Sequence, residues 1–181
     1  HCISAISDAY CKGIRNFDVD KAYEGMRKNA FETPSNLDEY KNGMGRRALT
    51  SYLEYGYIPL EDGVPDAFHT KEQVSRTLEY AYDDFALAQM AKALGKTDDY
   101  QALIRRAANY RNVIDPRTGY AQGRHADGTF LNDANAFNFA RFITEGAPCH
   151  YTWYVPQDPY GLMASMGGKD KYVATVSYTH L

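Results

Sequence analysis

Glu145 is the residue whose neighbours in the sequence most suggest chemistry. It comes directly before a glycine, and a proline follows three residues after it. Both residue types break helices, so we expect Glu145 to lie at the end of a helix rather than along a solvated helical face. A carboxylate at such an end can donate or accept a proton in a reaction.

Stacking and hydrogen-bonding side chains follow this carboxylate within the segment from Thr144 to Met163. They are His150, Tyr151, Trp153 and Tyr154, and Trp153 is the only tryptophan of the chain. Flat rings cover the faces of a pyranose and polar tips hold its hydroxyls, so this composition suits a sugar pocket. The alternative is a buried aromatic cluster beside an exposed glutamate, and composition alone favours that alternative.

Other acidic residues form smaller groups. Asp83 and Asp84 are adjacent in a helical stretch and point in different directions, whereas Glu79 and Asp83 share one helical face. For this group we expect a solvated or helix-capping role. Asp8 has two interpretations that the sequence favours equally. One is a hydrogen bond to the backbone or to Lys12 at a helix end, and the other is a role in a site.

The composition disfavours several classes of function. The 181 residues carry a net charge of −3 and no basic stripe, which disfavours a nucleic-acid partner. The sequence has no apolar run long enough to span a bilayer, and its three cysteines lack metal-ligand spacing. Motifs of phosphate-binding loops and of serine or zinc hydrolases are absent from the sequence. Carboxylates therefore remain the candidate catalytic groups.

Apolar residues recur at helical spacing through nearly the whole chain. We expect helices over residues 3–12, 19–32, 36–55, 74–94, 98–114, 134–143 and 159–166, and another from residue 169. Asp18 is the expected N-cap of the second helix. In the third helix, Leu53 is expected to face the core. Residues 59–70 are expected to form a loop, and residues 115–133 a long loop or a small hairpin.

Antiparallel helices joined alternately by short turns and long loops predict an all-α fold, with helix pairs wound into a toroid or a solenoid. The length allows one domain with a core. Residues 91–110 are similar to a tetratricopeptide pair. However, no self-similarity at a fixed period is visible, which disfavours a regular repeat array.

Five motifs, in this order along the chain, resemble glycoside hydrolase family 92. They are DAYCKGI (8–14), YLEYGYIP (52–59), TLEYAYDDFALAQMAKALGKTDDY (77–100), NYRNVIDPRTGYAQGR (109–124) and EGAPCHYTWYVPQDPYGLMASMGG (145–168). Members of that family are calcium-dependent exo-α-mannosidases, mostly secreted or periplasmic bacterial enzymes. The resemblance covers residues 1 to about 175.

The resemblance implies that residues 1–175 are a partial catalytic domain, all-α and part of an (α/α)6 toroid. It implies an inverting hydrolysis that removes terminal α-linked mannose from a glycan, with Glu145 as the general acid. The substrate-binding positions that it carries over are His150, Trp153, Gln157 and Asp158, the last of them as a supporting group.

Two positions depart from the family pattern. Cys149 stands where the family often has tryptophan, and Gln157 stands where histidine is frequent. A smaller side chain at 149 would enlarge the edge of the pocket, so the preferred linkage stays open. The paired aspartates at 83 and 84 are interpreted as structural within the resemblance.

Several parts of the enzyme are expected outside this chain. The resemblance places the catalytic base and the Ca²⁺ ligands downstream of Leu181, so no metal ligand is expected within the chain. A β-sandwich domain of the same parent chain is expected as a further partner. The fragment alone is therefore expected to be inactive and poorly soluble, and the parent to be secreted or periplasmic.

The last six residues, 176–181, match nothing in the family and resemble translated sequencing-adapter read-through, so we expect a non-native tail. The alternative function comes from a different class. A non-catalytic, solenoid-like module of helical pairs would bind a peptide or a glycan on its concave face. That alternative predicts a complete chain that is monomeric and soluble as it stands.

Overall fold

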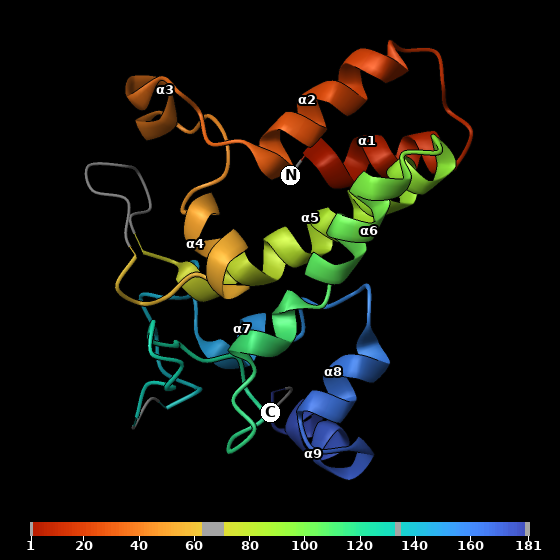
Figure 1. The fold of residues 1–181 in the computed structure, drawn as a ribbon. Helices are drawn as coiled ribbons and strands as arrows, with labels where there is room; N and C mark the ends of the chain where they lie inside the picture. Colours follow the sequence, from red (N-terminus) through yellow and green to blue (C-terminus); the bar gives the residue numbers. More distant parts are fainter. Residues whose placement is uncertain (1, 63–70, 133–134, 180–181) are drawn as a thin grey trace.

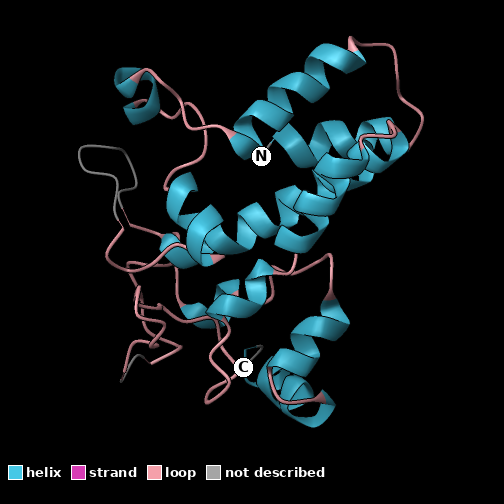
Figure 2. Ribbon diagram, viewed as in Figure 1, coloured by secondary structure: helices cyan, strands magenta, loops and turns pink. Residues whose placement is uncertain are grey.

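The structure is a computed structural model that describes residues 2–62, 71–132 and 135–179. Within these residues the chain forms helices and loops, with isolated bridges but no strands (Figure 2). The elements are α1 (Cys2–Cys11), α2 (Val19–Phe31), α3 (Leu37–Lys41), α4 (Leu49–Tyr55), α5 (Gln73–Ala93), α6 (Thr97–Arg106), the 3₁₀ helix η1 (Asn109–Val113), α7 (Pro148–Tyr151), α8 (Pro159–Ser165) and α9 (Lys169–Thr179). The predicted all-α class is therefore correct.

Helix α5 is the central element of the molecule. It crosses the middle of the molecule, with the α1–α2 pair on one side and the part that contains α7, α8 and α9 on the other (Figure 1). Fifteen of its 21 residues are buried, which is typical of a helix covered on all sides. Its first half joins one hydrophobic cluster through Val74 and Leu78, and its second half joins another through Leu87 and Met90. Helices α1 and α6 pack directly against it.

The first two helices follow the sequence prediction closely. Ile3 and Tyr10 of α1 are buried, and the chain leaves the helix through Gly13 with a φ of 91°. Asp18 is the N-cap of α2, where its side chain accepts a hydrogen bond of 3.0 Å from the backbone N–H of Lys21. These ends depend on local sequence signals, which explains why the prediction succeeds.

The expected helix over 36–55 is wrong, because it is split into the short helices α3 and α4. Gly43 and Gly45 interrupt it with φ angles of 106° and 72°, which side chains with a Cβ rarely adopt. Leu49 and Tyr52 of α4 are buried. Leu53 is 44% exposed, whereas the prediction placed it inside.

The predicted helix over 98–114 is shorter than expected. Helix α6 ends at Arg106, and a 3₁₀ turn, η1, continues the chain to Val113. A long irregular loop follows, as predicted, and two isolated bridges give it the hairpin-like pairs Ile114–Ala121 and Arg124–Phe130. Of the earlier predicted loop over 59–70, residues 59–62 form a turn and the remainder lies outside the described residues.

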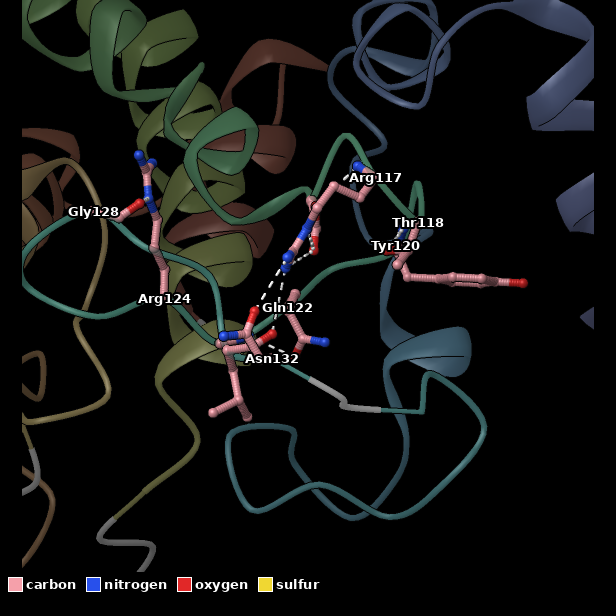
Figure 3. Close-up of polar contacts among 10 residues, drawn as sticks. Arg117, Thr118, Tyr120, Gln122, Arg124, Gly128 and Asn132 are labelled. Carbon is pink, nitrogen blue, oxygen red and sulfur yellow. Dashed lines mark hydrogen bonds and ion pairs between the residues drawn. The ribbon is translucent and has the colours of Figure 1, made fainter.

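Arginine side chains hold this long loop together (Figure 3). Arg117 donates to both carboxylate oxygens of Asp115, from Nη2 to Oδ2 at 2.8 Å and from Nε to Oδ1 at 3.0 Å, and its Nη1 reaches the side chain of Asn132 at 3.3 Å. Burial acts to raise the pKa of Asp115, but the hydrogen bonds and charge of Arg117 outweigh it and hold that pKa below its usual value. Arg124 Nε donates to the carbonyl of Gly128 at 2.7 Å.

The expected helix over 134–143 is also wrong: residues 135–143 form turns and bends, and Ala134 lies outside the described residues. The side chain of Asn135 accepts a hydrogen bond from the backbone N–H of Phe137 at 2.9 Å. This local turn competes with helix formation. Phe142 and Ile143 are nevertheless buried, as their apolar character suggests.

The last helices follow their predictions. Helix α8 begins with Pro159 after the N-cap Asp158, and α9 begins at Lys169 after a pair of glycines. Helix α9 extends to Thr179, and a helix there does not test whether residues 176–181 are native. Among the described residues, none of the helices combines the length and apolar character that crossing a bilayer requires.

Candidate functional site

Glu145 lies on an exposed turn three residues before α7, and not at the end of a helix as predicted. The reason is that the helix expected before it does not form. Its φ angle is 52°, in the left-handed region that residues with a Cβ seldom adopt. Such a conformation persists only where neighbouring contacts hold it, and it is concentrated at functional sites.

The N-terminus of α5 supplies those contacts. The residue before this helix, Glu72, has a φ of 64° and provides no side-chain cap. Instead, the carbonyl of Phe142 accepts hydrogen bonds from the N–H groups of Val74 and Ser75, at 3.0 and 3.3 Å. The loop that carries Glu145 therefore caps the first turn of α5, and the helix in return holds the loop.

His150 is an exposed residue of α7 whose ring reaches back to the same turn. Its Nδ1 accepts a hydrogen bond of 3.2 Å from the backbone N–H of Ala147. Gly146 permits this approach, since a Cβ at that position would lie 3.1 Å from the His150 Nδ1. With Nδ1 as an acceptor, the neutral ring carries its proton on Nε2, where it can donate to a ligand.

Tyrosines line the path from α7 to α5. The hydroxyl of Tyr151 donates to the carboxylate of Glu79. Burial, reinforced by that carboxylate, raises the pKa of Tyr151. Tyr154 lies edge-on to Tyr82 of α5 with ring centroids 5.8 Å apart, and burial raises its pKa to about 12. Both tyrosines are therefore neutral donors at ordinary pH.

Trp153 has its indole directed toward the C-terminal helices. Its Nε1 donates to the carbonyl of Cys149 at 2.8 Å, and its ring meets Tyr172 of α9 edge-on at 5.4 Å. Half-buried in this way, the ring has a fixed orientation. Cys149 is buried, and burial raises the pKa of its thiol.

Gln157 and Asp158 contact a different part of the molecule. Gln157 Nε2 donates to the carbonyl of Ala107 at 3.3 Å, while its buried Oε1 has no hydrogen-bond partner among the described residues. Asp158 accepts from Tyr110 at 2.7 Å and from Arg111 at 2.9 Å, besides capping α8. Burial acts to raise the pKa of Asp158, but these hydrogen bonds hold it below its usual value.

The structure therefore divides the five sequence-predicted residues by what they contact. Glu145 and His150 belong to the turn held by α5, whereas Gln157 and Asp158 are tied to the region of α6 and η1. Trp153 contacts α9. Their common role in a substrate pocket stays a prediction.

Two residues of α5 that the sequence analysis did not assign to the site accept hydrogen bonds from the segment that carries it. Ser75, which is fully buried, accepts a hydrogen bond from the backbone N–H of Thr144 at 2.8 Å. Glu79 accepts from Tyr151 and also borders a cavity of about 660 Å³ beneath α1 and α2. Their spacing of four residues places them on one helical face, which is the signal that could have found them.

The adjacent aspartates of α5 differ from the prediction of a solvated or capping role. Asp83 and Asp84 are 4% and 0% exposed. Asp84 is paired with Arg46 and Arg106 at 2.7 and 2.9 Å, which gives it a structural role, as the resemblance implied. Asp8 accepts from Lys12 at 2.7 Å, the helix-end contact that the sequence analysis considered.

The described part of the chain contains no group of three or more His, Cys, Asp or Glu side chains able to hold a metal ion. Calcium binding requires six to eight oxygen ligands, many of them carboxylates. The described residues do not fit a Ca²⁺ site.

The fold and the site define a class of protein: an all-α domain of helix pairs with a carboxylate on a strained turn beside a tyrosine-rich segment. The chain belongs to glycosyl hydrolase family 92, because the model of the glycosyl hydrolase family 92 catalytic domain matches residues 1–181. The family resemblance inferred from the motifs is therefore confirmed.

Two solved structures are similar to this chain. One is a family GH92 alpha-mannosidase from Bacteroides thetaiotaomicron, with 36% identity and a TM-score of 0.82, matched over 98% of this chain and 21% of that one. The other is a family GH92 inverting mannosidase from Bacteroides thetaiotaomicron VPI-5482, with 32% identity and a TM-score of 0.83, matched over 97% and 22%. The chain thus forms part of the (α/α)6 toroid of this family.

A curated relative gives the same family relationship. An uncharacterized secreted glycosidase from Arthroderma benhamiae is 30% identical over an alignment of 205 residues, gaps included. The alignment covers 97% of this chain and 25% of the relative. The chain therefore spans about a quarter or less of the length of these relatives.

Proposed function

We propose that this chain is part of the catalytic domain of an inverting exo-α-mannosidase that removes terminal α-linked mannose from glycans. The observation that carries the proposal is the likeness to two mannosidase structures, with TM-scores of 0.82 and 0.83. The relative described as an inverting mannosidase supports the stereochemical part of the proposal.

Glu145 is proposed as the general acid. Inverting hydrolysis uses two carboxyl groups about 6.5–9.5 Å apart: one protonates the leaving oxygen and the other activates water on the opposite face of the sugar. Glu145 is exposed and lies on a turn whose left-handed backbone is held by α5, which suits a group that must meet the substrate in one orientation. The general base is proposed to come from the parent protein outside this chain.

The remaining predicted residues are proposed to bind the sugar or to support its pocket. His150 can donate from Nε2 to a hydroxyl, and the buried Oε1 of Gln157 is an acceptor without a partner. Trp153 offers a ring of fixed orientation for a pyranose face. Asp158 is a supporting group, since Tyr110 and Arg111 already bind its carboxylate.

The parent protein is proposed to bind Ca²⁺ through residues outside this chain and to contain a β-sandwich domain that packs beside the toroid. A secreted or periplasmic location is proposed for it as well. The curated relative described as a secreted glycosidase supports this location. The fragment alone is proposed to be inactive, because it supplies an acid without its base.

Replacing Glu145 with Gln in the full-length parent tests the acid. We expect turnover of a mannobiose to fall by about 10²–10⁴-fold, because its leaving oxygen needs a proton. An aryl mannoside with a strongly activated leaving group should lose far less. Nuclear magnetic resonance of the first product should detect β-mannose, the sign of inversion.

The exposed Glu54→Gln on α4 is the matched control, and it should leave both substrates unaffected. Equal hydrolysis of mannobiose by the wild type and by Glu145→Gln would refute the acid assignment. An initial product of α-mannose would refute inversion while leaving the acid assignment intact.

A further inference from the structure

One face of α5 holds both ends of the segment that contains Glu145 and His150. Ser75 and Glu79 lie four residues apart on this face. Ser75 Oγ accepts the backbone N–H of Thr144 at 2.8 Å, and Glu79 accepts the hydroxyl of Tyr151. The candidate acid is thus bracketed by two hydrogen bonds to a single helix.

The contact at Ser75 is partly buried, with Thr144 at its outer side. The Ser75 side chain is 0% exposed, and the next residue of the loop core, Ile143, is 1% exposed. The Ser75 backbone N–H also donates to the carbonyl of Phe142, at 3.3 Å. One residue therefore binds the peptide groups on both sides of Ile143, and the loss of its hydroxyl would leave the partly buried N–H of Thr144 without this acceptor.

The residue that follows this anchored peptide is Glu145, with a φ of 52°. A glutamate does not hold this conformation by its own preference, since its Cβ crowds the backbone there. Without the hydrogen bond at Thr144, the turn can relax toward more populated dihedral angles and carry the carboxylate away from its position. A displacement of about 1 Å is enough to cost catalysis heavily.

We propose that Ser75 is a positioning residue that sets the orientation of Glu145 through the backbone of Thr144. The proposal rests on the function proposed above, because it requires Glu145 to be the general acid. Ser75 itself touches neither the sugar nor the reacting atoms. Its effect is therefore confined to the step that needs a correctly placed proton.

The experiment compares two substrates in the full-length parent, a mannobiose with a poor leaving group and an activated aryl mannoside. Ser75→Ala should lower kcat on mannobiose about tenfold and on the aryl mannoside less than twofold, because the latter needs little protonation. The ratio of the two values is the readout, since a general loss of folded enzyme lowers both equally.

Thr77→Val is the matched control. Thr77 lies on the same helix, is also fully buried, and accepts a backbone N–H, that of Ile58 at 3.0 Å, which belongs to a different segment from the Glu145 turn. It should leave the substrate ratio unchanged even where it lowers the yield. Tyr151→Phe, which removes the other hydrogen bond without changing size, should shift the ratio in the same direction as Ser75→Ala.

The outcomes separate the two proposals. A ratio shift in Glu145→Gln together with an unchanged ratio in Ser75→Ala overturns the positioning role alone. An unchanged ratio in Glu145→Gln overturns the acid assignment and the positioning role with it. If Ser75→Ala does not fold, Tyr151→Phe decides: a shifted ratio supports the α5 face as the support of the acid, and an unchanged ratio overturns it.

Discussion

Two carboxylates of this chain lie in opposite surroundings, and the surroundings decide what each can do. Asp84 is 0% exposed, and its oxygens accept hydrogen bonds from Arg46, Arg106 and Tyr52. The carboxylate of Asp84 is therefore occupied by contacts that hold the fold. Glu145 is exposed on a turn and remains accessible to a substrate. A buried, paired charge is structural, whereas an accessible carboxylate can exchange protons with a ligand.

Replacing Asp84 with Ala should destabilise the protein by about 3–5 kcal/mol, because it leaves a buried guanidinium without its counter-charge. Arg46 is the critical partner, since its side chain is only 2% exposed. Chemical denaturation of the parent protein measures the change in the free energy of unfolding.

The control is Asp8→Ala, which breaks the solvent-exposed pair with Lys12. We expect almost no change in the unfolding midpoint there, since exposed ion pairs contribute little. A similar loss of stability in both variants would show that burial does not determine how much the Asp84 ion pairs contribute to the free energy of unfolding.

Helices differ in which group accepts hydrogen bonds from the free backbone N–H groups at their N-termini. A helix start is predictable from the sequence where that acceptor is a neighbouring residue. Helix α2 is capped by its own neighbour Asp18, so its start follows from local sequence. Helix α5 has no side-chain cap and depends on the carbonyls of Arg141 and Phe142, about 70 residues further along the chain. The start of α5 and the Glu145 turn therefore form one structural unit.

Asp18→Ala should cost about 1 kcal/mol of stability, because the backbone N–H of Lys21 loses its acceptor. Thermal unfolding of the parent protein should register this as a lower midpoint. Glu24→Ala, an exposed substitution in the middle of the same helix, should leave the midpoint nearly unchanged. An equal effect of the two substitutions would contradict the capping role.

The molecule as a whole exposes several large apolar side chains. Phe137, Phe139 and Tyr160 are 53%, 71% and 83% exposed, and Ile14 and Met44 are more than half exposed as well. Part of a toroid exposes surface that the rest of the toroid would cover. This surface is a reason to expect that the chain associates when produced alone.

The isolated chain is predicted to form higher oligomers or aggregates rather than a monodisperse monomer. Size-exclusion chromatography with light scattering measures its mass in solution, and the full-length parent serves as the control. A stable, soluble monomer would favour the alternative of a helical-pair binding module over a part of an enzyme.

The sequence by itself determined the helices whose signals are local. Apolar spacing located α5, Asp18 located the start of α2, and the glycine and proline beside Glu145 drew attention to that carboxylate. Periodicity and capping act over a few residues, so one chain is enough to reveal them. The family motifs added the expected chemistry.

Only the tertiary structure decided how the Glu145 turn is held. The hydrogen bond between Thr144 and Ser75 joins residues 69 apart in the sequence, and that between Asp158 and Tyr110 joins residues 48 apart. Such pairs carry no periodic signal, because each depends on the packing of two distant segments. For the same reason, the turns over 135–143 were mistaken for a helix: their buried apolar residues pack against α5 without helical geometry.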